Sequence, residues 1–209
     1  EAGMTASLDA IGNCVGRYEG TTPGLPCLML GSHLDTVRDA GRYDGMLGVL
    51  AAIECVAALH ATHTRLPFAI EIVGFGDEEG VRYGSTLLGS RAVAGTFDRA
   101  LFDKVDAKGI PLREALRTFG LDADALGTVA RRPDQVLAYA ELHIEQGPIL
   151  EAEGKDIGVV GHGQGLWWLQ VTLTGKEAHT GSTPMPMREN AGLGMARITE
   201  LVHKIAMEN

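Results

Sequence analysis

The 209-residue sequence predicts an α/β fold built on a mostly parallel sheet. Short, strand-like apolar runs alternate along the chain with longer helix-like segments, which is the order that parallel sheets produce. Three of these runs also end in clusters of histidine and acidic residues. Hydrophobic residues make up 45% of the chain, which is enough for a substantial core.

The first 150 residues contain the predicted sheet. Alternating polar and apolar residues around Gly12 and Asn13 predict a pair of strands. Residues 27–34 form a short, continuously apolar run, typical of a strand that is buried on both faces. Residues 45–62 predict a helix with a single acid, Glu54, and this helix should therefore lie in the core. The remaining elements are strands at 66–75 and 135–147 and helices at 85–95 and 112–120.

The pattern changes near Gly163. Residues 166–179 alternate between apolar and polar side chains, as in an antiparallel strand with one solvated face, and residues 188–205 have a helical pattern. We therefore expect a catalytic domain at 1–162, present in part, and the first part of an α+β domain at 163–209. Both ends of the sequence read as interrupted helices, so the chain is expected to be a fragment.

Composition narrows the class of protein. The formal net charge of −9 argues against a nucleic-acid partner, because phosphate binding requires an excess of Lys and Arg. The cysteines, Cys14, Cys27 and Cys55, are odd in number and widely spaced, which predicts reduced thiols and a cytoplasmic location. No run of 18 apolar residues occurs, so no membrane span is expected, and the first residues do not resemble a signal peptide.

Chemistry-bearing residues follow three of the predicted strands. The first strand leads into His33 and Asp35, the second into residues 77–79, and the third into His143, while Asp44 precedes the first long helix. The carboxyl ends of parallel strands meet at one edge of a sheet, where α/β proteins bind ligands. Imidazoles and carboxylates that converge there stay unsatisfied without a cation. Nitrogen and oxygen ligands together suit zinc or manganese.

Spacing suggests roles for the acids. Residues two apart on a strand share a face, so the carboxylate of Asp35 is expected to contact the imidazole of His33. Adjacent Glu78 and Glu79 cannot easily share one role, so one is expected to bind metal and the other to take a proton from water. Two alternatives stay open: His33 alone would suit a hydrogen-bonded core histidine, and the two glutamates could simply cap the following helix.

Four segments carry a resemblance to a known family: GSHLDTV with GRYDG, GDEEGVRYGSTLLGS, ELHIEQGP and GKEAHTGSTPM. Together they resemble peptidase family M20, the dinuclear-metal aminoacylase and carboxypeptidase superfamily. Within it they look like the branch of N-carbamoyl-L-amino-acid hydrolases and allantoate amidohydrolases. The match covers nearly the whole chain. It implies a zinc-peptidase-like mixed sheet flanked by helices, followed by a lid and dimerisation domain.

The resemblance also implies roles for individual residues. His33 and His143 would bind one divalent ion, Asp44 would bridge two ions, and Glu79 would bind the second. Glu78 would be the general base. The ions would be zinc or manganese. One further histidine ligand of the second ion has no match in this sequence, so the family pattern places it outside the chain.

The same resemblance implies a catalytic role for Asp35 beside the general base. It implies substrate contacts for Gln146 and His179, with His179 reaching the active site of a partner subunit in a homodimer formed through the lid domain. The implied activity is hydrolysis of a linear ureido or amide C–N bond, foremost that of an N-carbamoyl-L-amino acid. The alternatives are allantoate, a β-ureidopropionase-like substrate, or an inactive metal-binding and dimerising module.

Overall fold

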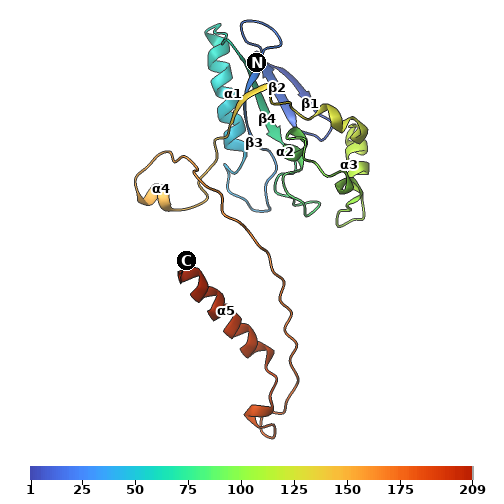
Figure 1. Cartoon of the computed structure of the whole chain (residues 1–209), viewed down its shortest axis with the longest axis vertical. Coiled ribbons are helices and arrows are strands. Elements are labelled where there is room, and N and C mark those ends of the chain that lie inside the picture. Colours follow the sequence, from blue (N-terminus) through green and yellow to red (C-terminus); the bar gives the residue numbers. More distant parts are fainter. Residues whose placement is uncertain (209) are drawn as a thin grey trace. The chain divides into compact units, whose positions relative to one another are not determined.

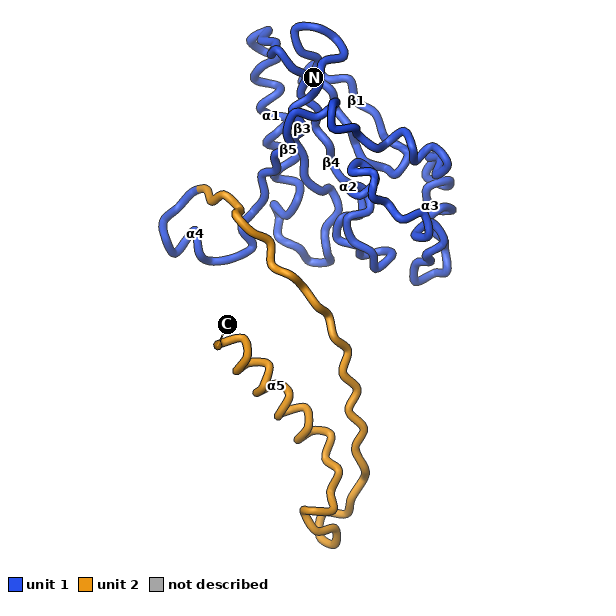
Figure 2. The backbone as a smooth tube through the Cα atoms, in the orientation of Figure 1, with its two compact units in different colours: residues 1–156 blue, residues 157–209 orange. Residues whose placement is uncertain are grey.

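The computed structural model describes residues 1–208, which divide into two compact units (Figure 2). The first unit, Glu1–Asp156, holds a five-stranded sheet in the order β1-β2-β4-β3-β5 (Figure 1). Its strands are β1 Thr5–Leu8, β2 Cys14–Tyr18, β3 Cys27–His33, β4 Ala69–Phe75 and β5 Val136–Ala140. Its helices are α1 Met46–Ala61, α2 Leu88–Val93, α3 Leu112–Phe119 and α4 Ile149–Ala152, with short 3₁₀ turns at Arg99–Asp103 and Ala123–Thr128.

The sheet is mixed. β3 runs parallel to both β4 and β5, whereas β1 pairs antiparallel with β2, and β2 pairs antiparallel with β4. The expectation of a mostly parallel sheet therefore holds only for the three strands that carry the polar clusters. β1 and β2 are antiparallel because a short turn joins them, with Gly12 in the left-handed region at φ 96°.

Apolar side chains cover both faces of the sheet. β4 is buried along its whole length, so its residues alternate between two separate cores. Val73 and Phe75 face a core that includes Leu88 and Leu116 from the helices α2 and α3. Ile70 and Ile72 face the second core, to which α1 contributes.

The prediction that residues 45–62 lie in the core holds for only one side of the helix. α1 buries Val49, Ala52 and Val56 against the sheet, but Leu50 is 60% exposed on the other side of the helix. The reason is that this helix packs against one face of the sheet and, among the described residues, has no second layer outside it. An apolar pattern around the whole helix therefore does not by itself predict that every side of the helix is covered.

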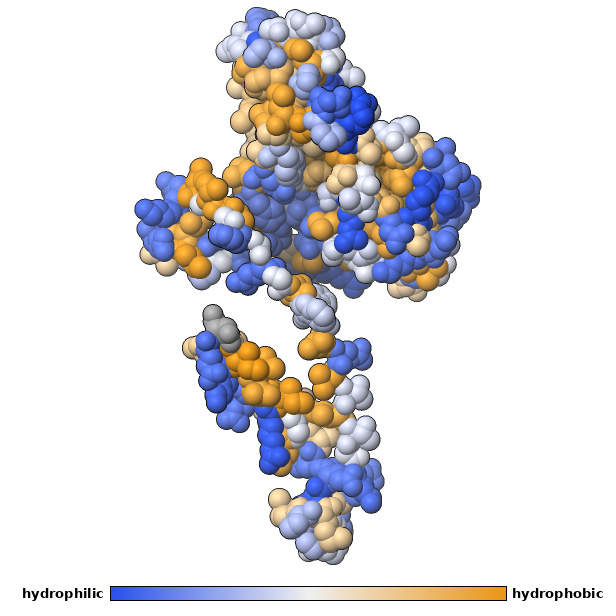
Figure 3. Space-filling model, in the orientation of Figure 1, coloured by the Kyte–Doolittle hydropathy of each residue, from blue (hydrophilic) through white to orange (hydrophobic). Residues whose placement is uncertain are grey.

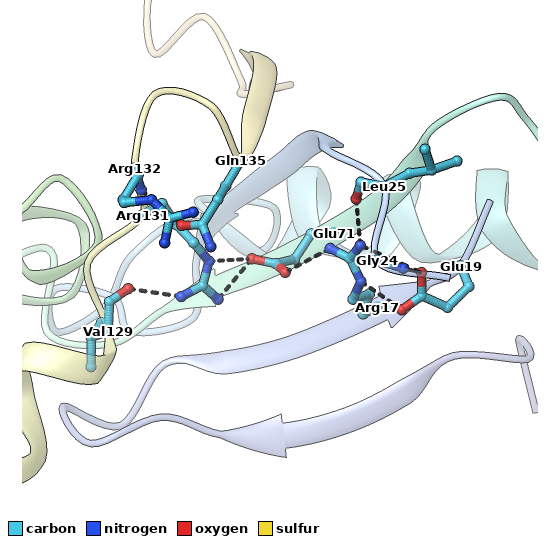
Figure 4. A network of polar contacts seen from close by, with 9 residues as sticks. All are labelled: Arg17, Glu19, Gly24, Leu25, Glu71, Val129, Arg131, Arg132 and Gln135. Atoms are coloured by element: carbon cyan, nitrogen blue, oxygen red, sulfur yellow. Dashed lines mark hydrogen bonds and ion pairs between the residues drawn. The ribbon is translucent and has the colours of Figure 1, made fainter. Parts of the chain in front are cut away.

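A buried carboxylate ties the segment before β5 to the sheet (Figure 4). Glu71 on β4 is only 5% exposed, and it lies 2.8 Å from a guanidinium nitrogen of Arg131 and 3.5 Å from one of Arg17 on β2. Arg131 also donates a 2.8 Å hydrogen bond to the carbonyl of Val129. Buried charges are stable only when they are paired in this way.

The second unit begins at Ile157 and contains a 3₁₀ turn, Met185–Met187, and the helix α5, Ala191–Glu208. The strand predicted at 166–179 does not form, because a strand needs a partner strand and no described strand pairs with this segment. Figure 3 shows apolar side chains along one face of α5. No described helix combines the length and apolar character that crossing a bilayer requires. All three cysteines are free.

Candidate metal centre

The carboxyl ends of β3, β4 and β5 lie at the same edge of the sheet because the three strands are parallel. His33 is the last residue of β3, and His143 follows shortly after the end of β5. Asp44 lies in the loop just before α1. The segment with Glu78 and Glu79 follows β4. The strand register thus brings residues distant in sequence to one place.

Three ligand atoms form a tight triangle. Nε2 of His33 lies 3.2 Å from Nε2 of His143 and 3.5 Å from Oδ1 of Asp44. Nε2 of His143 lies 3.3 Å from the same oxygen. A tetrahedral zinc ion with bonds of about 2.0–2.1 Å would separate its ligand atoms by about 3.3 Å. The spacing of the three atoms therefore fits a divalent cation.

Hydrogen bonding supports the same conclusion. Nδ1 of His33 lies 2.6 Å from the carbonyl of Asp35, and Nδ1 of His143 lies 2.9 Å from the carbonyl of Ile144. A carbonyl only accepts, so each Nδ1 carries the proton and each Nε2 keeps its lone pair for a metal. Oδ1 of Asp44, the third corner of the triangle, is buried without a hydrogen-bond partner. A cation would satisfy all three atoms.

Asp35 does not contact His33 as the two-residue spacing predicted. β3 ends at His33, so the alternation of a strand no longer applies at Asp35. Its backbone carbonyl, rather than its carboxylate, meets the imidazole. The carboxylate instead accepts hydrogen bonds of 2.9 Å and 3.0 Å from the backbone N–H groups of Glu78 and Glu79. Asp35 thereby links the loop after β3 to the glutamate pair after β4.

The two glutamates lie beside the histidine. His33, Glu78 and Glu79 each offer a ligand atom within 4.8 Å of the others, whereas the group that contains Asp44 consists of Asp44 and the two histidines. Burial raises the pKa of Glu78, and the nearby His33 opposes this rise. The glutamates do not cap α2, which begins at Leu88 and has Leu87 as its N-terminal flanking residue. Which of the two binds metal stays a prediction.

Two other ionisable groups near the pair are perturbed. Burial raises the pKa of Asp77 to about 6, and the charge of Asp35 adds to the rise. Burial alone would lower the pKa of His33, but its bond to the Asp35 carbonyl and the neighbouring carboxylates raise it overall. A histidine with a raised pKa holds its proton more tightly, so protons and metal compete for this site.

The two residues that resemblance suggests as substrate contacts lie in different units. Gln146 lines the same cavity as the cluster and donates a 2.9 Å hydrogen bond from Nε2 to Oδ2 of Asp44. His179 belongs to the second unit, where its Nδ1 accepts 3.1 Å hydrogen bonds from the N–H groups of Gly181 and Ser182. Their contacts with substrate stay predictions.

Several residues of the site were missed by sequence reasoning. A Cβ on Gly45 would lie about 2.5 Å from the ring of His33, so only glycine fits beside this histidine. Glu141 and Tyr139 line the cavity of about 750 Å³ that contains the cluster. Glu141 has a signal in the sequence, since it precedes His143 by two residues in a polar stretch. Gly45 has no such signal in the sequence, because its role depends on its contact with His33 in the folded protein.

Fold and site together define an α/β protein with a candidate metal-binding site at the carboxyl edge of its sheet. The model of peptidase family M20/M25/M40 matches residues 29–208, and the chain belongs to this family.

Similar proteins agree with this assignment. An N-carbamoyl-L-amino acid amidohydrolase of Geobacillus stearothermophilus is 44% identical over 208 residues, which cover 99% of this chain and 50% of that protein. An allantoate deiminase of Arabidopsis thaliana is 38% identical, with 98% of this chain and 40% of that protein covered. Among solved structures, this chain resembles the crystal structure of a hydantoinase/carbamoylase family amidase from Burkholderia multivorans, with a TM-score of 0.79. The two sequences are 34% identical, and the match covers 100% of this chain and 50% of that one. The chain spans about half the length of the curated relatives it matches. The likeness to the Burkholderia amidase structure confirms the predicted α/β fold.

Proposed function

We propose that the protein is a metal-dependent amidohydrolase that cleaves a linear ureido or amide C–N bond, foremost in an N-carbamoyl-L-amino acid. The observation that carries this proposal is the triangle of His33, Asp44 and His143, with its unpartnered Asp44 oxygen, in one cavity with Glu78. The name of the Geobacillus relative supports the substrate class.

The donor atoms suit zinc or manganese. We propose two ions: one held by His33, Asp44 and His143, and one held by Asp44, Glu79 and a ligand outside this chain. A bound divalent ion lowers the pKa of water toward neutrality and polarises the bond to be cleaved. This chain alone is expected to hold about one ion tightly, since protein zinc sites use three or four ligands.

Glu78 performs the proton transfers in this proposal. Its carboxylate accepts the proton of the attacking water and later donates it to the leaving nitrogen. Its raised pKa, caused by burial, favours both steps because a base with a pKa nearer to the working pH exchanges its proton more readily. Asp35 fixes the backbone of the glutamate pair through two hydrogen bonds.

We further propose a cytoplasmic homodimer that pairs through its second unit, in which His179 contacts substrate in the partner's active site. The support is the family resemblance of the segment around His179. Mixing His179→Ala with Glu78→Ala subunits tests this idea, because a hybrid dimer has one intact site. If activity does not return after verified subunit exchange, the shared site is refuted.

Allantoate is the second candidate substrate, and the allantoate deiminase of Arabidopsis favours it. A panel of N-carbamoyl amino acids, allantoate and dipeptides, assayed on the complete gene product with zinc or manganese, separates the two. Preference for dipeptides would contradict both.

The matched variant for this panel is Glu78→Gln. It should keep its metal but lose at least about two orders of magnitude in rate, the usual scale of general acid–base catalysis. If metal content falls together with activity, the roles of Glu78 and Glu79 are exchanged.

A further inference from the structure

Backbone pairing between β3 and β5 ends before it reaches the metal centre. The last registered pair of these strands is Leu30 with Ala140. His33 and His143 each lie three residues further along. Their Nε2 atoms are nevertheless only 3.2 Å apart. A contact other than the backbone ladder must therefore hold the two chain segments together at this point.

The carboxylate of Glu141 makes such a contact. Its Oε1 accepts a 2.7 Å hydrogen bond from the hydroxyl of Ser32, which is fully buried and directly precedes His33. Its Oε2 accepts a 2.6 Å hydrogen bond from the hydroxyl of Tyr139, which also lies 3.3 Å from the carbonyl of Gly31. Hydrogen bonds from hydroxyls to a carboxylate at these lengths are among the strong ones.

The hydroxyl of Tyr139 is well suited as a donor. Burial and then its bond to Glu141 raise the pKa of Tyr139, so it keeps its proton. The carboxylate therefore connects β5, through Tyr139, with β3, through Ser32. Ser32 directly precedes His33, and Glu141 precedes His143 by two residues. The hydroxyl of Tyr139 also lies beside the carbonyl of Gly31.

Helix α1 confines the same region from the other side. A Cβ on Gly48 would overlap the carbonyl of Leu142 and the Cβ of Ser32. The backbone of α1 thus approaches both Ser32 and the residue that follows Glu141. The backbone of the segment 141–143 therefore packs against this helix at Leu142, although the side chain of Leu142 is exposed.

We propose that Glu141 is a positioning residue of the metal centre, whose bridge between Ser32 and Tyr139 sets the separation of His33 and His143. The inference rests on the proposed metal centre and adds to it the contact that maintains its geometry. Glu141 is not itself a ligand in this account, since its two oxygens are directed to the hydroxyls of Ser32 and Tyr139. Among the described residues, neither group of converging ligand atoms includes it.

The test is the affinity of the protein for Zn²⁺, measured by competition with a chelator, together with the visible spectrum of the Co²⁺-loaded protein. Glu141→Ala and Ser32→Ala should each weaken Zn²⁺ binding about 10- to 100-fold, the usual cost of losing a residue that orients a ligand. The double variant should be no worse than Glu141→Ala, because both changes remove the same bridge. The Co²⁺ spectrum should change in all three.

Glu141→Gln is the conservative variant. Its side-chain oxygen still accepts from Ser32, so it should restore most of the Zn²⁺ affinity. Asp134→Asn, an exposed carboxylate just before β5, is the matched control for loss of charge and should bind Zn²⁺ as the wild type does. Melting temperatures of the metal-free variants control for loss of folding.

The outcomes separate the two proposals. If the wild-type protein binds no Zn²⁺, the proposed function fails and the bridge fails with it. If the wild type binds Zn²⁺ and both Ser32→Ala and Glu141→Ala bind it with the affinity of the wild type, only the bridge is refuted. If Glu141→Gln loses as much affinity as Glu141→Ala, charge rather than position matters, which also overturns the inference.

Discussion

Gln146 donates a 2.9 Å hydrogen bond to Oδ2 of Asp44, so the two oxygens of this carboxylate have different surroundings. Oδ2 has a donor, whereas Oδ1 faces the two histidines without one. Gln146 holds this position in the left-handed region, with φ at 53°. The geometry suggests that this residue orients the central ligand, besides any contact it makes with substrate.

Replacement of Gln146 by Ala separates these two roles. If the amide orients Asp44, the affinity for Zn²⁺ should fall roughly 10-fold or more in the absence of substrate, because an unrestrained carboxylate pays entropy on binding. Chelator competition measures this directly. Unchanged metal affinity combined with a raised KM would assign Gln146 to substrate alone.

Asp35→Asn tests the link between the loop after β3 and the glutamate pair. An asparagine has one acceptor oxygen where the carboxylate has two, so one of the N–H groups of Glu78 and Glu79 loses its partner. The turnover of the complete gene product should fall about 10- to 100-fold, with Zn²⁺ affinity little changed.

The control for this variant is Asp39→Asn, which removes the same charge from the same loop. Asparagine tolerates the positive φ of 56° at this position. Equal losses in the two variants would mean that loop charge, and not the bonds to the glutamate pair, matters. If Asp35→Asn lowers the affinity for Zn²⁺ and Asp39→Asn does not, the result would favour the contact between the Asp35 carboxylate and His33 that the sequence predicted.

Gly48→Ala should disturb the centre without altering any polar group. The added methyl group would collide with the carbonyl of Leu142, which belongs to the backbone and cannot move away cheaply. We expect weaker Zn²⁺ binding and a lower melting temperature than for Gly41→Ala, whose Cβ would meet no atom within 4 Å. Similar behaviour of the two variants would contradict the close packing of α1 against this segment.

Glu71→Gln should destabilise the first unit by about 3 kcal/mol, the lower end of the range for breaking a buried ion pair. Arg131 loses its carboxylate partner, whereas Arg17 keeps Glu19 at 2.8 Å, and Glu71 has only 6% of its side chain exposed. Urea denaturation measures the change. Glu114→Gln, in an exposed pair with Arg117, should change stability little because solvent screens that pair. Equal effects would show that the Glu71 pair contributes no more than a surface one.

Much of the fold was predictable because local patterns agree with it. The turn at Gly12, the apolar run that becomes β3 and the apolar run that becomes β4 each contain their own signal. Features that depend on neighbours were not predictable. The exposed side of α1 and the unpaired segment at 166–179 both depend on which layers and strands lie beside them, and a periodic pattern says nothing about that.

The site divides in the same way. His33 and His143 were found because their strands are parallel and end at one edge, a consequence of topology alone. The carboxylate of Asp35 was misplaced because the alternation of a strand does not extend to Asp35, two residues beyond the end of β3. The bridge by Glu141 was missed because hydrogen bonds between residues 109 apart in sequence leave no local pattern.

The position of β5 beside β3 has a consequence for the order in which the protein assembles. The two histidines are 110 residues apart in sequence, so the ion-binding triangle contains one of the most distant contacts in the first unit. Such contacts are costly to close and form slowly. The hairpin, β3, α1 and β4 can associate as they leave the ribosome, whereas the third ligand arrives only with the last strand. Tight metal binding therefore reports that β5 has joined β3, and an ion that binds only the folded state stabilises the chain at this step.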